Sequence, residues 1–418
     1  MVVGLPGENK LLKLMALLKT RDDRRMVQLD VLRGIAVLLV IGHHIVLQPS
    51  ESGMFGPVEN VFIRFGWSGV DLFFVLSGFL VGGLLFAELR ASGKLDVRRF
   101  IIRRGFKIWP SYFAYLLVVF LILLVGEQGN AHRALGHILP NFFHVQNYLG
   151  TARPHTWSLA VEEHFYVFLP LLLMVLTIRK NNNRDLKRAL PIIGIVIIVG
   201  CTTLRYLLNA GTEYNPATHY NPTHLRMDSL FFGVLISYFY HFRSTWLAKI
   251  GSYRYTLLCA GIALVLPLTI IDIRENWSVP VFGFLLLYLG YGLILVAIVY
   301  TPLSEGILGS VIGSPFGRLV AFIGFFSYPI YLWHIDLARL PLRALASAGF
   351  LSVLSPTWRW IAFTLIYVTL ATSAGVVLGL LVEKPALALR DKFFPSRTRA
   401  TLDLAVDPPK DQIGRAHV

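Results

Sequence analysis

Long apolar runs, rather than the alternating faces of amphipathic helices, dominate the hydrophobic pattern of this 418-residue chain. A helix needs roughly 20 mostly apolar residues to cross about 30 Å of hydrocarbon. By that measure, the predicted spans are residues 30–48, 69–89, 108–126, 157–178, 190–208, 225–242, 255–272, 279–300, 318–338 and 357–382. The pattern therefore predicts an all-α membrane protein, a polytopic bundle of about ten transmembrane helices.

The composition and the positions of the charges agree with this class. Hydrophobic residues make up 55% of the chain and charged residues only 15%, whereas soluble domains carry about a quarter charged residues. The net charge of +15 would suit a nucleic-acid-binding protein, but 29 of the 39 Lys and Arg residues fall in one set of alternate loops and only six in the other. This asymmetry argues against nucleic acid. It predicts that both termini are cytoplasmic and that basic residues contact anionic membrane lipids.

The spans divide the chain into three regions. Residues 1–29 are expected to form a basic cytoplasmic segment rather than a cleaved signal peptide, residues 30–392 a transmembrane domain, and residues 393–418 a disordered cytoplasmic tail. Cys201 and Cys259 fall inside spans and give neither a zinc spacing nor a disulfide framework. Because the histidines of the 127–156 loop match no metal-ligand spacing either, no metal is expected.

The first span carries an arginine and a histidine at a fixed distance. His44 follows Arg33 by 11 residues, which is about 16 Å and close to three turns of helix, so both side chains are expected on nearly the same face. His43 is expected to point about 100° away. Ionisable groups at membrane depth are costly and often functional. The alternatives are an arginine that reaches the headgroups and a hydrogen-bonded core histidine.

Other spans place polar residues in their extracytoplasmic halves, while cations gather at the cytoplasmic ends. The first group contains Asp71, Glu162, Arg226, Asp228, Tyr331 and His334, and the second contains Arg33 and the run "RRFIIRRGFKIWP" with Arg103, Arg104 and Lys107. A cationic cytoplasmic mouth suits a phosphate-rich donor. A histidine near a carboxylate suits removal of a proton from a hydroxyl. The basic run has a second interpretation, as a topology signal alone.

Seven segments also resemble, in the same order, those of acyltransferase family 3, whose membrane proteins acylate hydroxyls on bacterial surface glycans, lipids and small secreted molecules. The segments are "LDVLRGIAVLLVIGHH", "GVDLFFVLSGFL", "FIIRRGFKIWPSYF", "WSLAVEEHFYVFLPLLL", "LRMDSLFFGVL", "FFSYPIYLWHI" and "LVEKPALALR". They cover the chain from residue 28 to residue 390. The resemblance implies that residues 30–392 form a transmembrane acyltransferase domain in the cell inner (plasma) membrane.

The resemblance assigns roles residue by residue. The family's motif of Arg, ten residues and His falls on Arg33 and His44, which implies that His44 is the catalytic histidine. The family's Arg-x-x-Arg element falls on Arg104 and Lys107. The lysine lacks the planar bidentate fork of arginine, so a charged contact with a donor phosphate is expected to survive with altered geometry.

A second motif of the family, Trp-Ser-x-x-x-Glu, falls on Trp157, Ser158 and Glu162. His164 stands where the family often has Gln, which changes a local hydrogen bond or adds a titratable group. In this interpretation, a carboxylate, either Glu162 or Asp71, orients His44.

Together these features predict a membrane O-acyltransferase that moves an acyl group, expected to be acetyl, from cytoplasmic acyl-CoA to a hydroxyl of a glycan, glycolipid or small-molecule acceptor. Acyl-CoA is the expected co-substrate, with no bound cofactor. The predicted residues are His44, Glu162 and Asp71 for catalysis, Arg33, Arg103, Arg104 and Lys107 for donor binding, and Trp157, Ser158, Arg226, Asp228, Tyr331 and His334 for the acceptor or for support of the site. The alternative is a lipid or glycan transporter or flippase, because many spans with buried charges suit that function as well.

Overall fold

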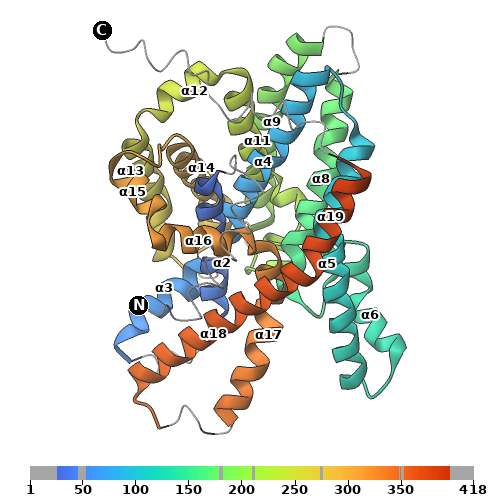
Figure 1. Cartoon of the computed structure of the whole chain (residues 1–418), viewed down its shortest axis with the longest axis vertical. Helices are drawn as coiled ribbons and strands as arrows, with labels where there is room; N and C mark the ends of the chain where they lie inside the picture. Colours follow the sequence, from blue (N-terminus) through green and yellow to red (C-terminus); the bar gives the residue numbers. More distant parts are fainter. Residues whose placement is uncertain are drawn as a thin grey trace, which may run out of the picture.

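Helices form the architecture, and no β-strand occurs in the part of the chain that the structure describes. This computed structural model describes residues 26–45, 53–177, 182–209, 212–273, 276–347, 349 and 353–395. Most of the predicted N-terminal segment and nearly all of the predicted tail therefore lie outside the described residues. Figure 1 shows α2 and α4 in the middle of the bundle, with the α5–α6 and α17–α18 pairs extending to one end of it.

The described helices follow one another with short connections. The longer ones are α2 (Val27–His44), α3 (Gly56–Phe65), α4 (Gly69–Ser92), α5 (Val97–Gly126), α6 (Ala131–Phe142), α8 (Trp157–Thr177), α9 (Asn182–Asn209), α11 (Met227–Phe242), α12 (Ser244–Gly251), α13 (Arg254–Val265), α14 (Phe284–Val299), α15 (Gly306–Gly313), α16 (Pro315–Phe325), α17 (Ser327–Ser347), α18 (Pro356–Leu378) and α19 (Lys384–Phe393). The shorter ones are η2 (Gly53–Phe55), η3 (Gly66–Ser68), α7 (Gln146–Leu149), η4 (Pro154–Thr156), α10 (Pro216–His219), η5 (Thr223–Leu225), η6 (Leu266–Thr269), and the π-helices η7 (Val279–Gly283) and η8 (Gly379–Glu383).

Seven helical segments of the described chain are long and apolar enough to cross a membrane. They are Val27–His44, Gly56–Ser92, Val97–Gly126, Pro154–Thr177, Arg188–Asn209, Val279–Val299 and Pro356–Phe393. Two bent pairs, α12 with α13–η6 and α15 with α16, raise the number to nine if each pair is one span. The chain is thus a multi-pass helical membrane protein. The number ten and the side on which the termini lie stay predictions.

The structure differs from the hydrophobic pattern at three predicted spans. The predicted span 225–242 corresponds to α11, whose 16 residues make it shorter than the seven segments above. The predicted helix 318–338 is interrupted at Phe326, where α16 ends and α17 begins. Upstream of that break, α16 forms an angle of 62° with α15. The predicted span 255–272 is likewise the second half of a pair bent by 79°. An apolar run reports the length of chain that avoids water but not where the helix axis turns, so the pattern missed both bends.

Close helix packing at the centre explains how polar residues are held there. The α4–α11 contact is close, because Gly78 faces the Leu230 carbonyl and Gly233 faces the Val75 carbonyl, each too close to leave room for a β-carbon. Small residues let membrane helices approach backbone to backbone. On the other side of the core, α2 packs against α16 and also contacts α4, α3 and α17.

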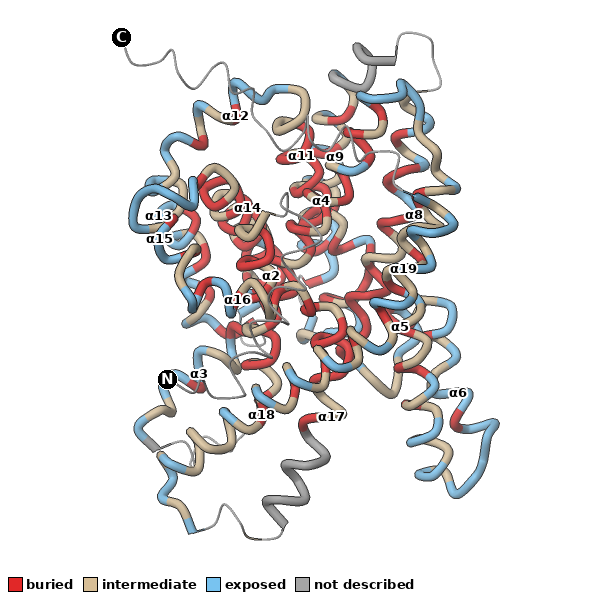
Figure 2. Tube along the Cα trace, in the orientation of Figure 1, coloured by how far each residue is buried: buried red, intermediate tan, exposed pale blue. Residues whose placement is uncertain are grey.

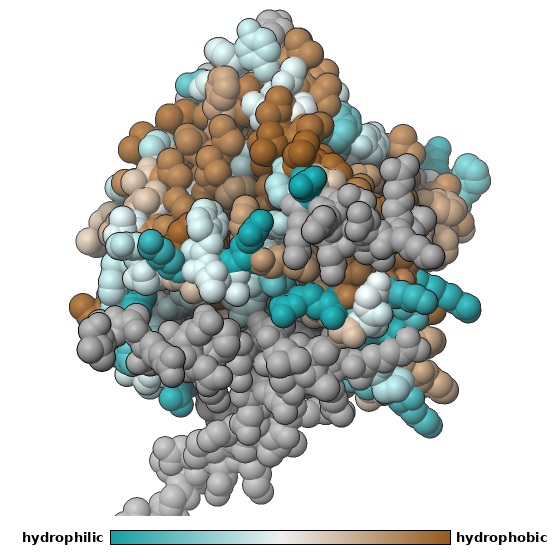
Figure 3. Space-filling view, turned by 90° about the horizontal axis from the view of Figure 1, so that it is seen from above, coloured by the Kyte–Doolittle hydropathy of each residue, from teal (hydrophilic) through white to brown (hydrophobic). Residues whose placement is uncertain are grey.

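Burial separates this core from the lipid-facing surface. Figure 2 shows α2, α4, α11 and α14 mostly buried, whereas α6 and α12 are largely exposed. Large apolar side chains remain on the outside, among them Val125, Ile195 and Leu381. Broad apolar areas lie next to a group of hydrophilic side chains in Figure 3. This surface suits hydrocarbon with a polar boundary rather than water.

Candidate active site

A cavity of about 120 Å³ opens among α2, α4, α5, α8 and the α16–α17 junction. Its charged side chains are Arg33, Arg104, Lys107 and Glu162, and its hydroxyls belong to Ser77, Ser158, Tyr166, Ser327, Tyr328 and Tyr331. The rest of the wall is apolar and includes Phe73, Phe74 and Ile108. An apolar wall with a few convergent polar groups is typical of a small-molecule site.

Local sequence brings the cations to this wall. Asp96 caps the start of α5 by accepting a hydrogen bond from the Arg99 backbone N–H at 3.0 Å. Arg104 and Lys107 follow at a spacing of three residues, which puts them on one helix face. The Arg104 guanidinium lies 5.4 Å from the centre of the Tyr166 ring. Arg33 reaches the same cavity from α2.

Two further arginines of the basic run, Arg99 and Arg103, turn away from the cavity to the end of α19. Arg103 and Arg99 donate to the backbone carbonyls of Phe394 and Pro395. Arg103 also lies 3.6 Å from the Asp391 carboxylate. Cations at the carbonyl end of a helix compensate its dipole and its unpaired carbonyls. The basic run thus serves two purposes, since one face lines the cavity and another holds the C-terminal helix.

Lys107 has a carboxylate partner that the sequence did not single out. Its Nζ forms an ion pair with Glu383, the last residue of the π-helix η8. The Glu383 side chain is only 7% exposed. This residue belongs to the quoted segment "LVEKPALALR", and the available signal was a lone carboxylate directly after a long apolar run. The charge of Lys107 is therefore compensated within the protein.

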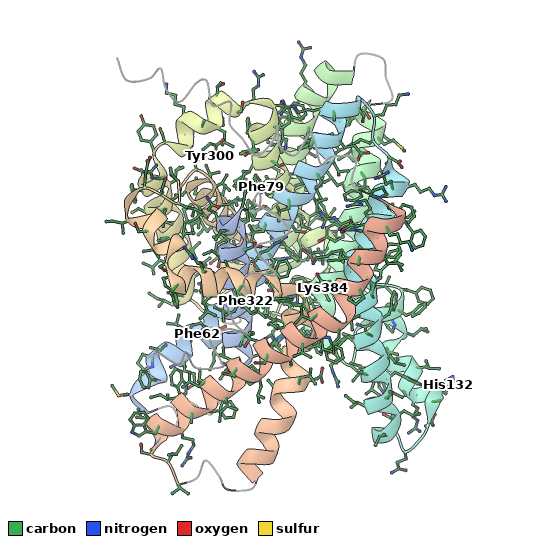
Figure 4. The ribbon with its side chains drawn as sticks, in the orientation of Figure 1. Phe62, Phe79, His132, Tyr300, Phe322 and Lys384 are labelled. Carbon is green, nitrogen blue, oxygen red and sulfur yellow. The ribbon has the colours of Figure 1, made fainter. Side chains whose placement is uncertain are left out.

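His44 lies at the last turn of α2 and is not among the residues that line the cavity. Its Nδ1 is 2.8 Å from the Val40 carbonyl oxygen and 3.2 Å from Nε2 of His334. The two rings have centroids 4.9 Å apart. His43 faces α3 instead, with Nδ1 2.7 Å from the Ile63 carbonyl oxygen. Phe62 of the same helix lies against α2 at Gly42 (Figure 4).

Tyr331 connects the cavity with these histidines. Its hydroxyl donates to the backbone oxygen of His155 at 2.6 Å and lies 2.6 Å from Ser158 Oγ. Its own carbonyl oxygen is 2.6 Å from His334 Nδ1. Because Tyr331 and Ser158 both line the cavity, the His334–His44 pair lies directly behind this end of it.

A second polar cluster is buried between α4, α9 and α11. Arg226 forms an ion pair with Asp71, and Arg205 pairs with Asp228 at 2.6 Å, with all four side chains fully buried. The Arg226 guanidinium also lies 3.8 Å from the centre of the Phe284 ring. Trp157 borders the same arginine at 5.9 Å. These contacts join the central helices.

The expected site residues therefore separate into four places. Arg33, Arg104, Lys107, Glu162, Ser158 and Tyr331 share the cavity, His44 and His334 lie behind it, Asp71, Arg226 and Asp228 form the buried cluster with Trp157 beside it, and Arg103 contacts α19. Of the two carboxylates expected near His44, Asp71 bonds to Arg226 and Ser229. Glu162 shares the cavity wall with Arg104 and Tyr166.

The histidines of the loop 127–156 do not gather into one site. His132 lies at the far end of the α5–α6 pair, away from the cavity (Figure 4). His144 stacks on the Tyr112 ring with centroids 4.7 Å apart. Within the described ranges, no group of three or more His, Cys, Asp or Glu side chains is placed to hold a metal ion.

Comparison with protein families identifies this architecture. The family described as "Acyltransferase domain" matches residues 26–380. The chain belongs to this acyltransferase family. The match begins just before α2 and ends within η8, so it includes both the cavity and the histidine pair.

Curated relatives of this chain carry related names. A Staphylococcus aureus (strain MSSA476) protein provisionally named an O-acetyltransferase is 29% identical over 336 residues, which are 76% of this chain and 51% of that protein. The peptidoglycan O-acetyltransferase OatA of Listeria monocytogenes is 27% identical over 338 residues, 77% of this chain and 51% of its own length. The chain thus spans about half the length of these relatives. No solved structure matches it significantly.

Proposed function

We propose that this acyltransferase moves an acyl group, expected to be acetyl, from cytoplasmic acyl-CoA to a hydroxyl of a glycan, glycolipid or other small acceptor at the cell inner membrane. The observation that carries the proposal is one cavity lined by cations, with Tyr331 on its wall in contact with His334 and, through it, His44. Acyl-CoA is a co-substrate in this proposal, and no resident cofactor is invoked.

The donor end is proposed from the charges. Arg104 is the cavity cation best suited to the phosphates of coenzyme A, because Lys107 pairs with Glu383 and Arg33 lies 3.6 Å from Asp30. Arg33 adds a second cation to the same wall. Charge-assisted hydrogen bonds from arginine to phosphate are among the stronger polar contacts in proteins. The apolar lining residues would contact the uncharged arm of the donor, so that its thioester reaches Tyr331.

The chemical step is proposed at His44. The imidazole accepts the proton of the acceptor hydroxyl while the hydroxyl oxygen attacks the thioester carbonyl carbon. The carbon–sulfur bond breaks, and the leaving thiolate takes the proton from the imidazolium to give coenzyme A with a free thiol. A route in which His44 carries the acyl group between two such steps has the same overall balance.

The supporting residues follow from their contacts. Glu162 would be a catalytic carboxylate within the cavity that Arg104 also lines. Asp71, Arg226 and Asp228 would support the site indirectly, because their ion pairs hold the central helices together. Ser158 would hold Tyr331 at the passage between donor and histidine.

The test is turnover of radiolabelled acetyl-CoA by purified protein in nanodiscs. We expect hydrolysis or transfer above the rate of protein-free nanodiscs. Muramyl glycan fragments are a reasonable first acceptor, because two relatives are named for peptidoglycan. A wild-type protein that binds and turns over no acyl-CoA of any chain length would refute the proposal and favour the transporter alternative. Mass spectrometry of envelope glycans, lipids and secreted metabolites from a deletion strain would then name the acceptor.

A further inference from the structure

The His334 side chain lies against the ring of His44, with ring centroids 4.9 Å apart. It comes from the first turns of α17 and is fully buried, whereas His44 is half-buried. The two histidines are 290 residues apart in the chain. Their contact depends on the packing of α17 against α2.

The hydrogen bonds of the pair fix where its protons lie. A carbonyl oxygen only accepts, so the 2.6 Å contact with the Tyr331 oxygen means that His334 Nδ1 carries the hydrogen. A neutral imidazole has a single N–H, which leaves a lone pair on His334 Nε2. By the same argument, His44 Nδ1 carries the hydrogen that points to the Val40 oxygen at 2.8 Å. That hydrogen also lies within reach of the His334 lone pair at 3.2 Å.

The consequence concerns the other nitrogen of His44. With Nδ1 protonated, its Nε2 bears the lone pair and is the atom able to accept a proton. We infer that His334 is a positioning residue, which holds His44 in the Nδ1–H tautomer and orients its ring so that Nε2 can accept the proton of the acceptor hydroxyl. This inference rests on the proposed function and adds to it the partner that prepares the base.

The surroundings of His334 fit a fixed rather than an adaptable group. Tyr331, whose carbonyl accepts from His334, is itself held by Ser158 and by the His155 backbone. The next histidine ring, that of His155, lies 5.5 Å from His334. On α18, Gly375 approaches Ile330 so closely that a β-carbon would clash with its backbone. The turn of α17 that carries His334 therefore has little freedom to move.

Two amide substitutions separate the roles of the two nitrogens. In His334→Gln the amide oxygen can occupy the place of Nε2 and still accept from His44. In His334→Asn the shorter amide reaches only the place of Nδ1, so it can donate to Tyr331 but not accept from His44. Alanine removes both bonds. Because all three variants lose the same ring, a purely packing role predicts similar activity for Gln and Asn.

We expect His334→Gln to keep kcat within about tenfold of wild type, and His334→Asn and His334→Ala to lose about 100-fold or more, since a positioned base contributes at least this much. The KM for acyl-CoA should stay unchanged in all three variants, which must elute as monodisperse protein. Equal kcat of the Gln and Asn variants, whether high or low, would overturn the inference. So would loss of activity through KM alone.

A measurement on the wild-type protein covers the case in which the variants do not fold. Histidine labelled with ¹⁵N reports its tautomer by solid-state NMR, and His44→Gln assigns the signal. We expect neutral His44 with the hydrogen on Nδ1, and a dominant Nε2–H form would overturn the inference. This readout needs no turnover. A wild-type protein inactive towards acyl-CoA would therefore refute the proposed function while leaving the tautomer measurable.

Discussion

At the scale of single residues, neighbours in the sequence have different surroundings. His43 and His44 are adjacent, yet one bonds to the Ile63 carbonyl of α3 and the other contacts His334 of α17. Arg103 and Arg104 are adjacent too, and only Arg104 lines the cavity. A helix turns by about 100° per residue, so each pair offers a substitution together with its own control.

Substitution of the adjacent residues His43 and His44 tests catalysis. We expect His44→Ala to lower acyl transfer by 10²–10⁴-fold, as for loss of a positioned general base, and His43→Ala to keep most of the activity. Both variants should remain folded, because each loses modest packing and one or two hydrogen bonds. The test compares the initial rates of both variants and wild type with labelled acetyl-CoA, on proteins with matching size-exclusion profiles. Full activity of folded His44→Ala would contradict the assignment, and loss in His43→Ala alone would mean that the neighbour is the catalytic histidine.

The arginine pair tests donor binding. We expect Arg104→Ala to raise the KM for acyl-CoA about tenfold or more, because a hydrogen bond to a charged group contributes about 1.5–3 kcal/mol. Arg103→Ala should leave this KM unchanged, since that side chain holds the end of α19 instead. Titration of initial rate against acyl-CoA concentration measures both values. Equal shifts in the two variants would show that the basic run acts as a diffuse charge and not through one face.

At the scale of helices, charged side chains join elements that the sequence keeps far apart. Arg226 and Asp71 are separated by 155 residues and pair between α11 and α4. These are the same two helices whose glycines bring their backbones together. A buried pair of this kind fixes which helices meet, but it adds little net stability over a well-packed apolar pair.

The α4–α11 pair therefore gives a stability prediction. Asp71→Leu alone leaves the Arg226 charge buried without its carboxylate, and we expect it to cost about 3–5 kcal/mol. The double variant with Arg226→Met should recover much of this loss, because no buried charge then lacks a partner. Thermal stability followed by fluorescence-detected size exclusion compares the three proteins. A double variant as unstable as the single one would show that the site depends on the ions themselves.

The C-terminal helix gives a second prediction at this scale. Glu383 joins η8 to Lys107, so we expect Glu383→Gln to loosen α19 from α5 and to leave the Lys107 ammonium at the cavity wall without its carboxylate partner. Cleavage of the α19 region by added protease should become faster in this variant. Glu127→Gln, at an ion pair remote from α19, is the matched control and should not change the cleavage. Unchanged protease sensitivity of Glu383→Gln would show that the arginine–carbonyl contacts hold α19 by themselves.

At the scale of the whole molecule, the distribution of Lys and Arg orients the bundle. We expect a cysteine introduced at His132, which is exposed, to react with an impermeant maleimide in intact cells. One introduced at Asn182 should react only after permeabilisation. Cys201 and Cys259 are replaced by serine in both variants, so that the introduced thiol gives the signal. Labelling of the Asn182 position from outside would show that the bundle has the opposite orientation to the one predicted.

The agreement between sequence and structure differs from one part of the protein to another. The helical membrane class follows from apolar runs, and seven of the predicted spans coincide with helices able to cross a membrane. Arg33 and Arg104, expected together at the cytoplasmic ends, line one cavity, and Glu162, which the sequence placed with the extracytoplasmic group, lines it as well. The break at Phe326 and the ion pair of Glu383 with Lys107 do not follow from the sequence, since neither a bend nor a partner 276 residues away leaves a periodic signal.

The sequence by itself determined whether each segment lies in lipid or in water. Lipid requires every backbone polar group to be bonded internally, so long apolar runs must become helices whatever their neighbours are. Tertiary packing alone decided the partners: His334 beside His44, Arg226 with Asp71, and Arg103 turned to α19 while Arg104 enters the cavity. The reason is physical. Helix formation depends on local hydrogen bonds and hydropathy, whereas a contact between side chains depends on how the separate helices cross.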